Sequence, residues 1–178
     1  MSGYRFRHPL VGAPRVLAGL LTLLVATSGP ACVGGARLAN AESSPEEIVL
    51  AVLDALERKD SEHLRELALS EEEFREIVWP ELPAARPERN LPFSDVWGDL
   101  KVKSDAALAG LLKEYGGRAL VLTDLRFRGG TTQYESYVVH RTPTLRVLDA
   151  GGVDHELRLF GSILERGGRF KLFSYVVD

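Results

Sequence analysis

Two titratable side chains in the C-terminal half of the chain could support acid–base chemistry. His140 lies in 134–141, a segment typical of a strand, and an unperturbed imidazole titrates at about pH 6.5. Asp124 continues the alternation of Leu120 and Leu122 along a predicted strand. Its carboxyl could therefore point to the same face as these leucines, into the interior of the domain. If the two side chains met, they would form a general acid–base couple. The alternative is a surface pairing of Asp124 with Arg126 or Arg141, with His140 at a strand end.

Aromatic and small side chains could instead line a pocket for an apolar ligand. Apolar walls with a few polar groups are typical of small-molecule sites. The residues that the sequence predicts for this role are Trp97, Tyr134, His140, Gly161 and Ser174. The competing interpretation is that the aromatic rings among them pack in the core or in an interface.

Metal and cofactor chemistry have little support in the sequence. The chain has one cysteine, and its four histidines form no cluster with zinc-ligand spacing. The glutamates at 71–73 could hold a cation, but acids at the start of a helix also stabilise its positive end. No Gly-Gly pair precedes the lysine and hydroxyl residue of a phosphate-binding loop. We therefore expect no metal and no cofactor.

Residues 1–31 have the pattern of a secretory signal peptide. Residues 1–41 carry four arginines and no acidic residue, and 16–26 is an unbroken run of 11 apolar or small residues. A membrane-spanning helix needs ~20 such residues, so this run is short for a single-pass membrane anchor, which is the alternative to a signal peptide. Cys32 follows Ala31 in a pattern that resembles a bacterial lipoprotein signal, with mature protein starting at a lipidated Cys32. If Cys32 is lipidated, 32–43 would be a flexible tether. The alternative is a simple secretory signal that is cleaved near Ala31 or after 39–41.

The remainder of the chain is acidic. After residue 41 there are 18 basic and 25 acidic residues, a formal charge of −7. This balance disfavours binding to nucleic acid or to anionic lipid. We therefore expect an exported protein of the periplasm or cell envelope that contacts a membrane only through its signal or a lipid anchor. The length of 44–178 suits a single domain.

Helix signals come first in this domain. Ser44 begins a capping box with Pro45 in the first turn, and Ser70 begins a second box that ends at Glu73. Apolar residues recur at helical spacing over 48–56. Ser94 is expected to cap a longer helix that stops at Gly116-Gly117.

Strand signals dominate from Arg118 onward. Segments rich in β-branched and aromatic residues cover 118–128, 134–141, 144–148, 155–166 and 170–177, and Gly-Gly pairs separate several of them. Helices followed by strands with short turns predict an α+β fold. We expect N-terminal helices packed on one curved antiparallel sheet of four to five strands.

The last hairpin predicts two different faces of this sheet. With a two-residue turn at 167–168, Gly161 faces Ser174, and this pair of small residues would leave a hollow. The opposite face would be aromatic and partly exposed. An exposed aromatic patch usually marks an interaction surface, so the candidate homodimer interface consists of Phe160, Phe173 and Tyr175.

This order of elements resembles the nuclear transport factor 2-like superfamily, a cystatin-like α+β cone. The resemblance rests on the opening helix at 51–60 (AVLDALERKD) and on the closing strand at 167–175 (GGRFKLFSY). It implies a cone-shaped domain over 44–178. Its members include pocket enzymes of isomerase and cyclase type, ligand carriers and noncatalytic binding domains, often dimeric through the sheet. The catalytic aspartate and tyrosine of the isomerases have no matching motif here, so the resemblance implies no activity.

The sequence thus predicts a noncatalytic exported domain. It would bind a small apolar ligand or a protein partner, in a cone-shaped pocket or through its sheet. Two alternatives stay open. One is a pocket enzyme of isomerase, cyclase or dehydratase type that uses His140 and Asp124, and the other is a structural envelope factor without a cavity.

Overall fold

The computed structural model of the chain describes residues 36–89 and 91–177. The predicted signal peptide, Cys32 and the start of the tether lie outside the described residues. Within the described ranges, no helix is both long and apolar enough to cross a membrane.

Helices make up the first half of the domain, and two of them begin at predicted caps. Ser44 accepts a hydrogen bond from the Glu47 amide, and Ser70 forms a full capping box with Glu73. The structure differs at Ser94, because α4 begins two residues earlier than predicted, with Pro92 as its N-cap. The helices are α1 (Pro45–Arg58), α2 (Ser61–Leu67), α3 (Glu71–Glu73) with its π-helical continuation η1 (Phe74–Val78), and α4 (Phe93–Tyr115).

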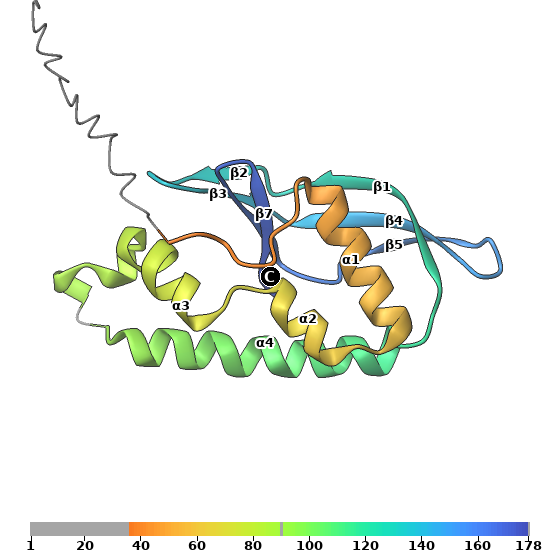
Figure 1. The fold of residues 1–178 in the computed structure, drawn as a ribbon, viewed down its shortest axis with the longest axis horizontal. Coiled ribbons are helices and arrows are strands. Elements are labelled where there is room, and N and C mark those ends of the chain that lie inside the picture. The colour runs from red at the N-terminus through yellow and green to blue at the C-terminus, as the bar shows by residue number, and fades with distance from the viewer. Residues whose placement is uncertain (1–35, 90, 178) are drawn as a thin grey trace, which may run out of the picture. The chain divides into compact units, whose positions relative to one another are not determined.

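A proline-rich segment joins η1 to α4, and its described part contains three short 3-10 turns. These turns are η2 (Trp79–Glu81), η3 (Pro83–Ala85) and η4 (Pro87–Arg89). Figure 1 shows α4 running along one side of the domain, with α1 and α2 between it and the strands.

Within the described residues, seven strands follow α4 and form two antiparallel sheets. The strands are β1 (Leu120–Phe127), β2 (Thr131–Gln133), β3 (Val138–Arg141), β4 (Pro143–Asp149), β5 (Asp154–Leu157), β6 (Ser162–Arg166) and β7 (Arg169–Ser174). One sheet has the order β1-β4-β5 and the other β2-β3-β6-β7. The α+β class is confirmed, but the single sheet that the sequence predicts is divided in two.

The division arises from a sharp bend in one continuous meander. β3 pairs with β2 and β6, whereas β4, which starts after a single intervening residue, pairs with β1 and β5. That residue, Thr142, has a left-handed φ of 53°, which is rare for a β-branched residue and turns the chain. Its backbone carbonyl accepts from Arg128 and its amide donates to Gly161, each at 3.1 Å. The pairing therefore continues across the bend, and the bend supplies the predicted curvature.

The last hairpin keeps the predicted register only near its turn. Ile163 lies opposite Leu172, as expected. A bulge between Ser162 and Ile163 then places Ser162 opposite Ser174. Because a bulge inserts one residue into one strand, Gly161 does not face Ser174, which corrects the predicted pairing.

Two hydrophobic clusters lie on opposite faces of β6 and β7. Ile163 and Leu172 belong to the first cluster, which packs against α1 and α2. Leu164 and Phe173 contact the second cluster, which packs against η1 and the first half of α4. Since successive strand residues point to opposite faces, this part of the sheet is covered on both sides.

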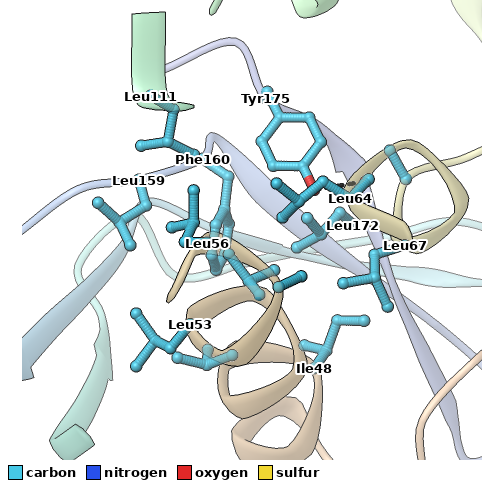
Figure 2. Packing of buried hydrophobic residues seen from close by; sticks show 14 of the residues in the cluster. Ile48, Leu53, Leu56, Leu64, Leu67, Leu111, Leu159, Phe160, Leu172 and Tyr175 are labelled. Atoms are coloured by element: carbon cyan, nitrogen blue, oxygen red, sulfur yellow. Dashed lines mark hydrogen bonds between the residues drawn. The ribbon is translucent and has the colours of Figure 1, made fainter. Parts of the chain in front are cut away.

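Phe160 and Tyr175 lie inside the first cluster. Their exposed fractions are 0% and 2%. Figure 2 shows Phe160 among the leucines of the first cluster, and the Tyr175 hydroxyl directed at Leu64, whose carbonyl accepts its hydrogen bond at 2.5 Å. These two residues therefore do not form the exposed homodimer patch predicted from the sequence. Phe173, the third residue of that patch, is half-buried against Phe74, with ring centroids 6.1 Å apart.

Two segments of chain cover the outer edge of β7. Glu42 and Phe170 exchange two backbone hydrogen bonds of 2.9 Å, and the Leu69 amide donates to the Leu172 carbonyl at 2.9 Å. An unpaired edge strand would otherwise offer its backbone to other chains. The flexible tether predicted for 32–43 is thus wrong over its described part, because 36–42 is held against the domain.

Lys171 and Glu73 form an ion pair beneath this segment. The lysine Nζ lies 2.9 Å from both carboxylate oxygens, and the side chains are 3% and 5% exposed. Lys171 also donates to the Ala39 carbonyl at 2.7 Å, and Glu73 accepts from the amides of Ala39 and Ser70 at 2.7 Å. Buried charges are tolerated when they are paired and hydrogen-bonded in this way.

Removing one partner of this pair leaves the other charge buried alone. Lys171→Met is expected to lower the free energy of unfolding by about 3–5 kcal/mol, measured by urea denaturation. The control Lys103→Met breaks an exposed pair with Asp99 and is expected to cost only about 0–1 kcal/mol. The double variant Glu73→Gln/Lys171→Met should be less destabilised than Lys171→Met alone. An unchanged unfolding midpoint for Lys171→Met would contradict this account.

Candidate functional site

Asp124 does not enter the interior, because β1 contains a bulge next to it. The register of β1 on β4 shifts between Leu122 and Asp124. After the shift, Leu125 and Phe127 continue the inward row that Leu122 belongs to. Asp124 instead forms an ion pair with the Arg126 side chain at 2.6 Å. This is the surface pairing that the sequence left open as the alternative.

His140 is half-buried beside a different carboxylate. Its Nε2 lies 2.8 Å from Glu165 on the neighbouring strand. The rings of Phe127 and Phe170 lie 5.1 Å and 6.1 Å from the imidazole. Neither His140 nor Asp124 lines any of the cavities described below. The predicted couple is therefore not assembled, and sequence reasoning missed Glu165 because strand register decides that contact.

A cavity of about 300 Å³ lies between α4, the end of α2 and the end of β7, and we call it the helix-side cavity. Its apolar wall consists of Ala68, Leu69, Trp97, Leu100, Leu108, Phe173 and Tyr175. Hydroxyl and charged groups, among them Ser104 and Lys101, line the rest of it. The volume is at the low end of the range for small-molecule pockets, roughly 300–1,000 Å³.

The sequence of α4 explains how its side chains reach this cavity. Trp97, Leu100, Ser104 and Leu108 recur at spacings of three and four, which places them on one face of a helix. Ser104 Oγ accepts a hydrogen bond of 3.1 Å from the Tyr175 amide, which fixes α4 to the end of β7. Burial raises the pKa of the Tyr175 phenol, so this wall of the cavity stays neutral at physiological pH.

A second cavity of about 430 Å³ adjoins the helix-side cavity, and we call it the sheet-side cavity. Leu100, Phe173 and Ser174 line both cavities. The remaining lining residues come from strands β2, β3 and β6 of the four-stranded sheet and from the chain beside its strands: Thr132, Tyr134, Val139, Arg141, Gly161, Ser162 and Val176.

Four of the five predicted ligand residues line these cavities. Trp97 lines the helix-side cavity, Tyr134 and Gly161 line the sheet-side cavity, and Ser174 lines both. The fifth, His140, lines neither. Arg141 was not among the predicted residues, although its position after His140 at the end of a strand marks it as the next side chain on the opposite face.

A third hollow, of about 600 Å³, contains a histidine–carboxylate pair that the sequence analysis did not single out. His155 Nε2 lies 2.9 Å from Asp149 on the β4–β5 hairpin. Bonding to His155 and to the backbone amides of Val153 and Gly151 lowers the pKa of the Asp149 carboxyl. Both side chains are more than a third exposed. The pair therefore stabilises a solvent-exposed turn and does not form an enclosed site.

Within the part of the chain that the structure describes, no group of three or more His, Cys, Asp or Glu side chains is placed to hold a metal ion. The glutamates at 71–73 serve as the first turn of a helix, as the capping box indicates. Glu73 is committed to Lys171.

Comparisons of the chain with protein-family models, with curated proteins and with solved structures found no match.

Gly161 is required where the C-terminal segment crosses the sheet. A Cβ at this position would overlap the carbonyl oxygen of Val176. Gly161→Ala is expected to destabilise the domain by about 1–3 kcal/mol, the usual cost of overpacking, and to disturb the sheet-side cavity.

The matched control is Gly110→Ala on α4, where a Cβ meets nothing within 4 Å. Alanine in a helix is favoured over glycine by about 0.5–1 kcal/mol, so this variant should be slightly stabilised. Thermal unfolding of both variants measures the contrast, and equal midpoints would disprove the close-approach role of Gly161.

Proposed function

We propose that the domain is a noncatalytic binding domain that takes a small apolar ligand in the helix-side cavity. The observation that carries this proposal is the lining of that cavity, in which Trp97, Leu100, Leu108 and Phe173 provide a largely apolar wall with hydroxyl groups beside it. A ligand with up to three aromatic rings suits a volume of about 300 Å³. Burial of its apolar surface would supply the affinity.

The chemistry of the cavity favours binding over catalysis. A general acid or base has to reach the substrate within hydrogen-bond distance or through one water. The titratable side chains of the helix-side cavity are Arg65, Glu71, Lys101, Asp105 and Tyr175. Lys101 pairs with Asp105, Glu71 pairs with Arg75 at 2.6 Å, and Tyr175 donates to a backbone carbonyl. Arg65 donates to the Ser61 carbonyl at 3.2 Å. Each of these groups thus has a neutralising or fixed partner, and neither His140 nor Asp124 lines this cavity.

We further propose that the domain is a nuclear transport factor 2-like cone on an exported envelope protein. Support for the family comes from helices that precede a strongly bent antiparallel meander. Support for export comes from the basic, apolar start of the chain.

The fold also bears on where export processing would cut. Cleavage after Ala41 would remove Ala39, whose amide and carbonyl complete the bonding of the buried Lys171–Glu73 pair. It would also remove the Ala41 carbonyl that accepts from Arg169. We therefore favour a mature N-terminus before residue 36, near Ala31 and Cys32.

Ligand binding is tested with N-phenyl-1-naphthylamine, a neutral apolar probe. Trp97→Ala removes a cavity wall and should weaken probe binding about tenfold, as expected for loss of ~1.4 kcal/mol of apolar contact. The control Trp79→Ala removes an indole from the same cluster outside the cavity and should leave affinity nearly unchanged. In a Trp79→Phe background the bound probe should quench the emission of Trp97. Absence of quenching with saturating probe, or equal affinities for both alanine variants, would reject the site.

Processing is tested by intact mass spectrometry of the mature protein, after expression of the full chain in a Gram-negative host. We expect a chain that starts at Cys32 with added lipid mass, and a Cys32→Ser variant that lacks this mass. A mature chain that begins at Glu42 would contradict the proposal.

A further inference from the structure

The sheet-side cavity carries a charge opposite to that of the domain around it. Its lining includes the guanidinium of Arg141 and the hydroxyls of Thr132, Tyr134, Ser162 and Ser174, and it includes no carboxylate. The chain after residue 41 has 25 acidic and 18 basic residues. A single cationic side chain in an otherwise acidic protein favours the local binding of small anions.

Several donors in this cavity are not used by the fold. Among the described residues, no hydrogen bond or ion pair engages the side chain of Arg141 or the hydroxyls of Thr132, Tyr134 and Ser162. The arginines of the adjoining sheet differ in this respect. Arg126 and Arg146 each pair with a carboxylate, as do most arginines that face structural partners.

Strand register brings two of these donors, Arg141 and Ser162, into one row with Ser174. Arg141 lies opposite Ser162, and Ser162 lies opposite Ser174 on the next strand. Directly paired residues of neighbouring strands share a face of the sheet. The bulge at Ser162 creates this row, because without it Gly161 would lie opposite Ser174.

An apolar floor lies beside the polar row. Val139, two residues before Arg141, is 9% exposed and lines the cavity together with Leu100, Phe173 and Val176. A ligand that fits both parts has one anionic group and an apolar body. Guanidinium presents a planar fork that matches a carboxylate in a bidentate manner.

We propose that the sheet-side cavity binds a small apolar carboxylic acid, with its carboxylate on Arg141 and Ser162 and its apolar body against Val139, Leu100 and Phe173. The volume of about 430 Å³ accommodates a medium-chain or single-ring acid. Arg141 is the one charged residue in the lining, which matches a ligand with a single negative charge. Inorganic phosphate has no apolar part that could contact the apolar floor. This site adjoins the helix-side cavity, with which it shares Leu100, Phe173 and Ser174, but it does not depend on a ligand there.

The test is isothermal titration calorimetry with sodium octanoate and, as its uncharged analogue, 1-octanol. The wild-type protein should bind octanoate more tightly than octanol. Arg141→Met keeps the apolar stem and should weaken octanoate binding about 10- to 100-fold, the usual effect of a charge-assisted pair, while octanol binding stays unchanged. Arg141→Lys should retain part of the preference for octanoate.

The matched control is Arg126→Met, which removes an exposed arginine of the adjoining sheet and should leave both affinities unchanged. Thermal unfolding of each variant verifies that it is folded, and Ser162→Ala provides a second variant with a smaller loss of octanoate affinity. Equal binding of octanoate and octanol by the wild type, or full octanoate affinity in Arg141→Met, would overturn the proposal. Inorganic phosphate that competes as strongly as octanoate would overturn the apolar-acid assignment. Retention of octanoate binding in Trp97→Ala separates this site from the helix-side cavity, so either proposal can fail alone.

Discussion

Lys171 and Glu73 are withdrawn from water together, and three distant segments of chain must be in place for this to happen. The lysine comes from β7, the carboxylate from the first turn of α3, and the remaining bonds come from the backbone of Ala39. A buried ion pair gains little over apolar packing but is costly to break. The pair therefore fixes the relative positions of β7, α3 and the N-terminal segment, because displacing any of them removes a bonding partner from a buried charge. Both cavities are lined by the end of β7 and by α4, which Ser104 ties to the end of β7. The helix-side cavity is also lined by Glu71 in the first turn of α3.

Irregularities in the strands, more than the strands themselves, decide which side chains meet. The left-handed Thr142 turns one meander into two sheets. The bulge beside Asp124 sends that carboxylate to the surface. The bulge at Ser162 aligns Arg141, Ser162 and Ser174 across neighbouring strands. Each of these features changes the face on which every later residue of the strand lies, so three local departures account for the positions of most candidate functional side chains.

Local signals in the sequence were sufficient for the parts of the fold that depend on near neighbours. The capping residues Ser44 and Ser70, the α+β order and the pairing of Ile163 with Leu172 follow from spacing and turn chemistry. The predictions that failed needed a count of residues across an entire strand. Alternation alone placed Phe160 and Tyr175 on an exposed face, whereas the bulge and the covering helices bury them. Residues 36–42 are held in place by contacts with Phe170 and Lys171, which are far away in the sequence. A local sequence pattern cannot predict such contacts.

The covered edge of β7 has a consequence for the order in which the domain folds. The backbone of Ala39 and the side chain of Lys171 meet across 132 residues of sequence. Closing so long a loop costs conformational entropy before any contact rewards it, and folds dominated by distant contacts form slowly. While the chain grows from its N-terminus, residues 36–42 have no strand to pair with, and Glu73 stays hydrated until the last strand arrives. Docking of β7 is thus the closing step of folding. A chain that lacked β7 would leave residues 36–42 without a pairing strand and Glu73 without its ion-pair partner. It would also turn β6, an inner strand of the complete sheet, into an edge strand that is open to other molecules.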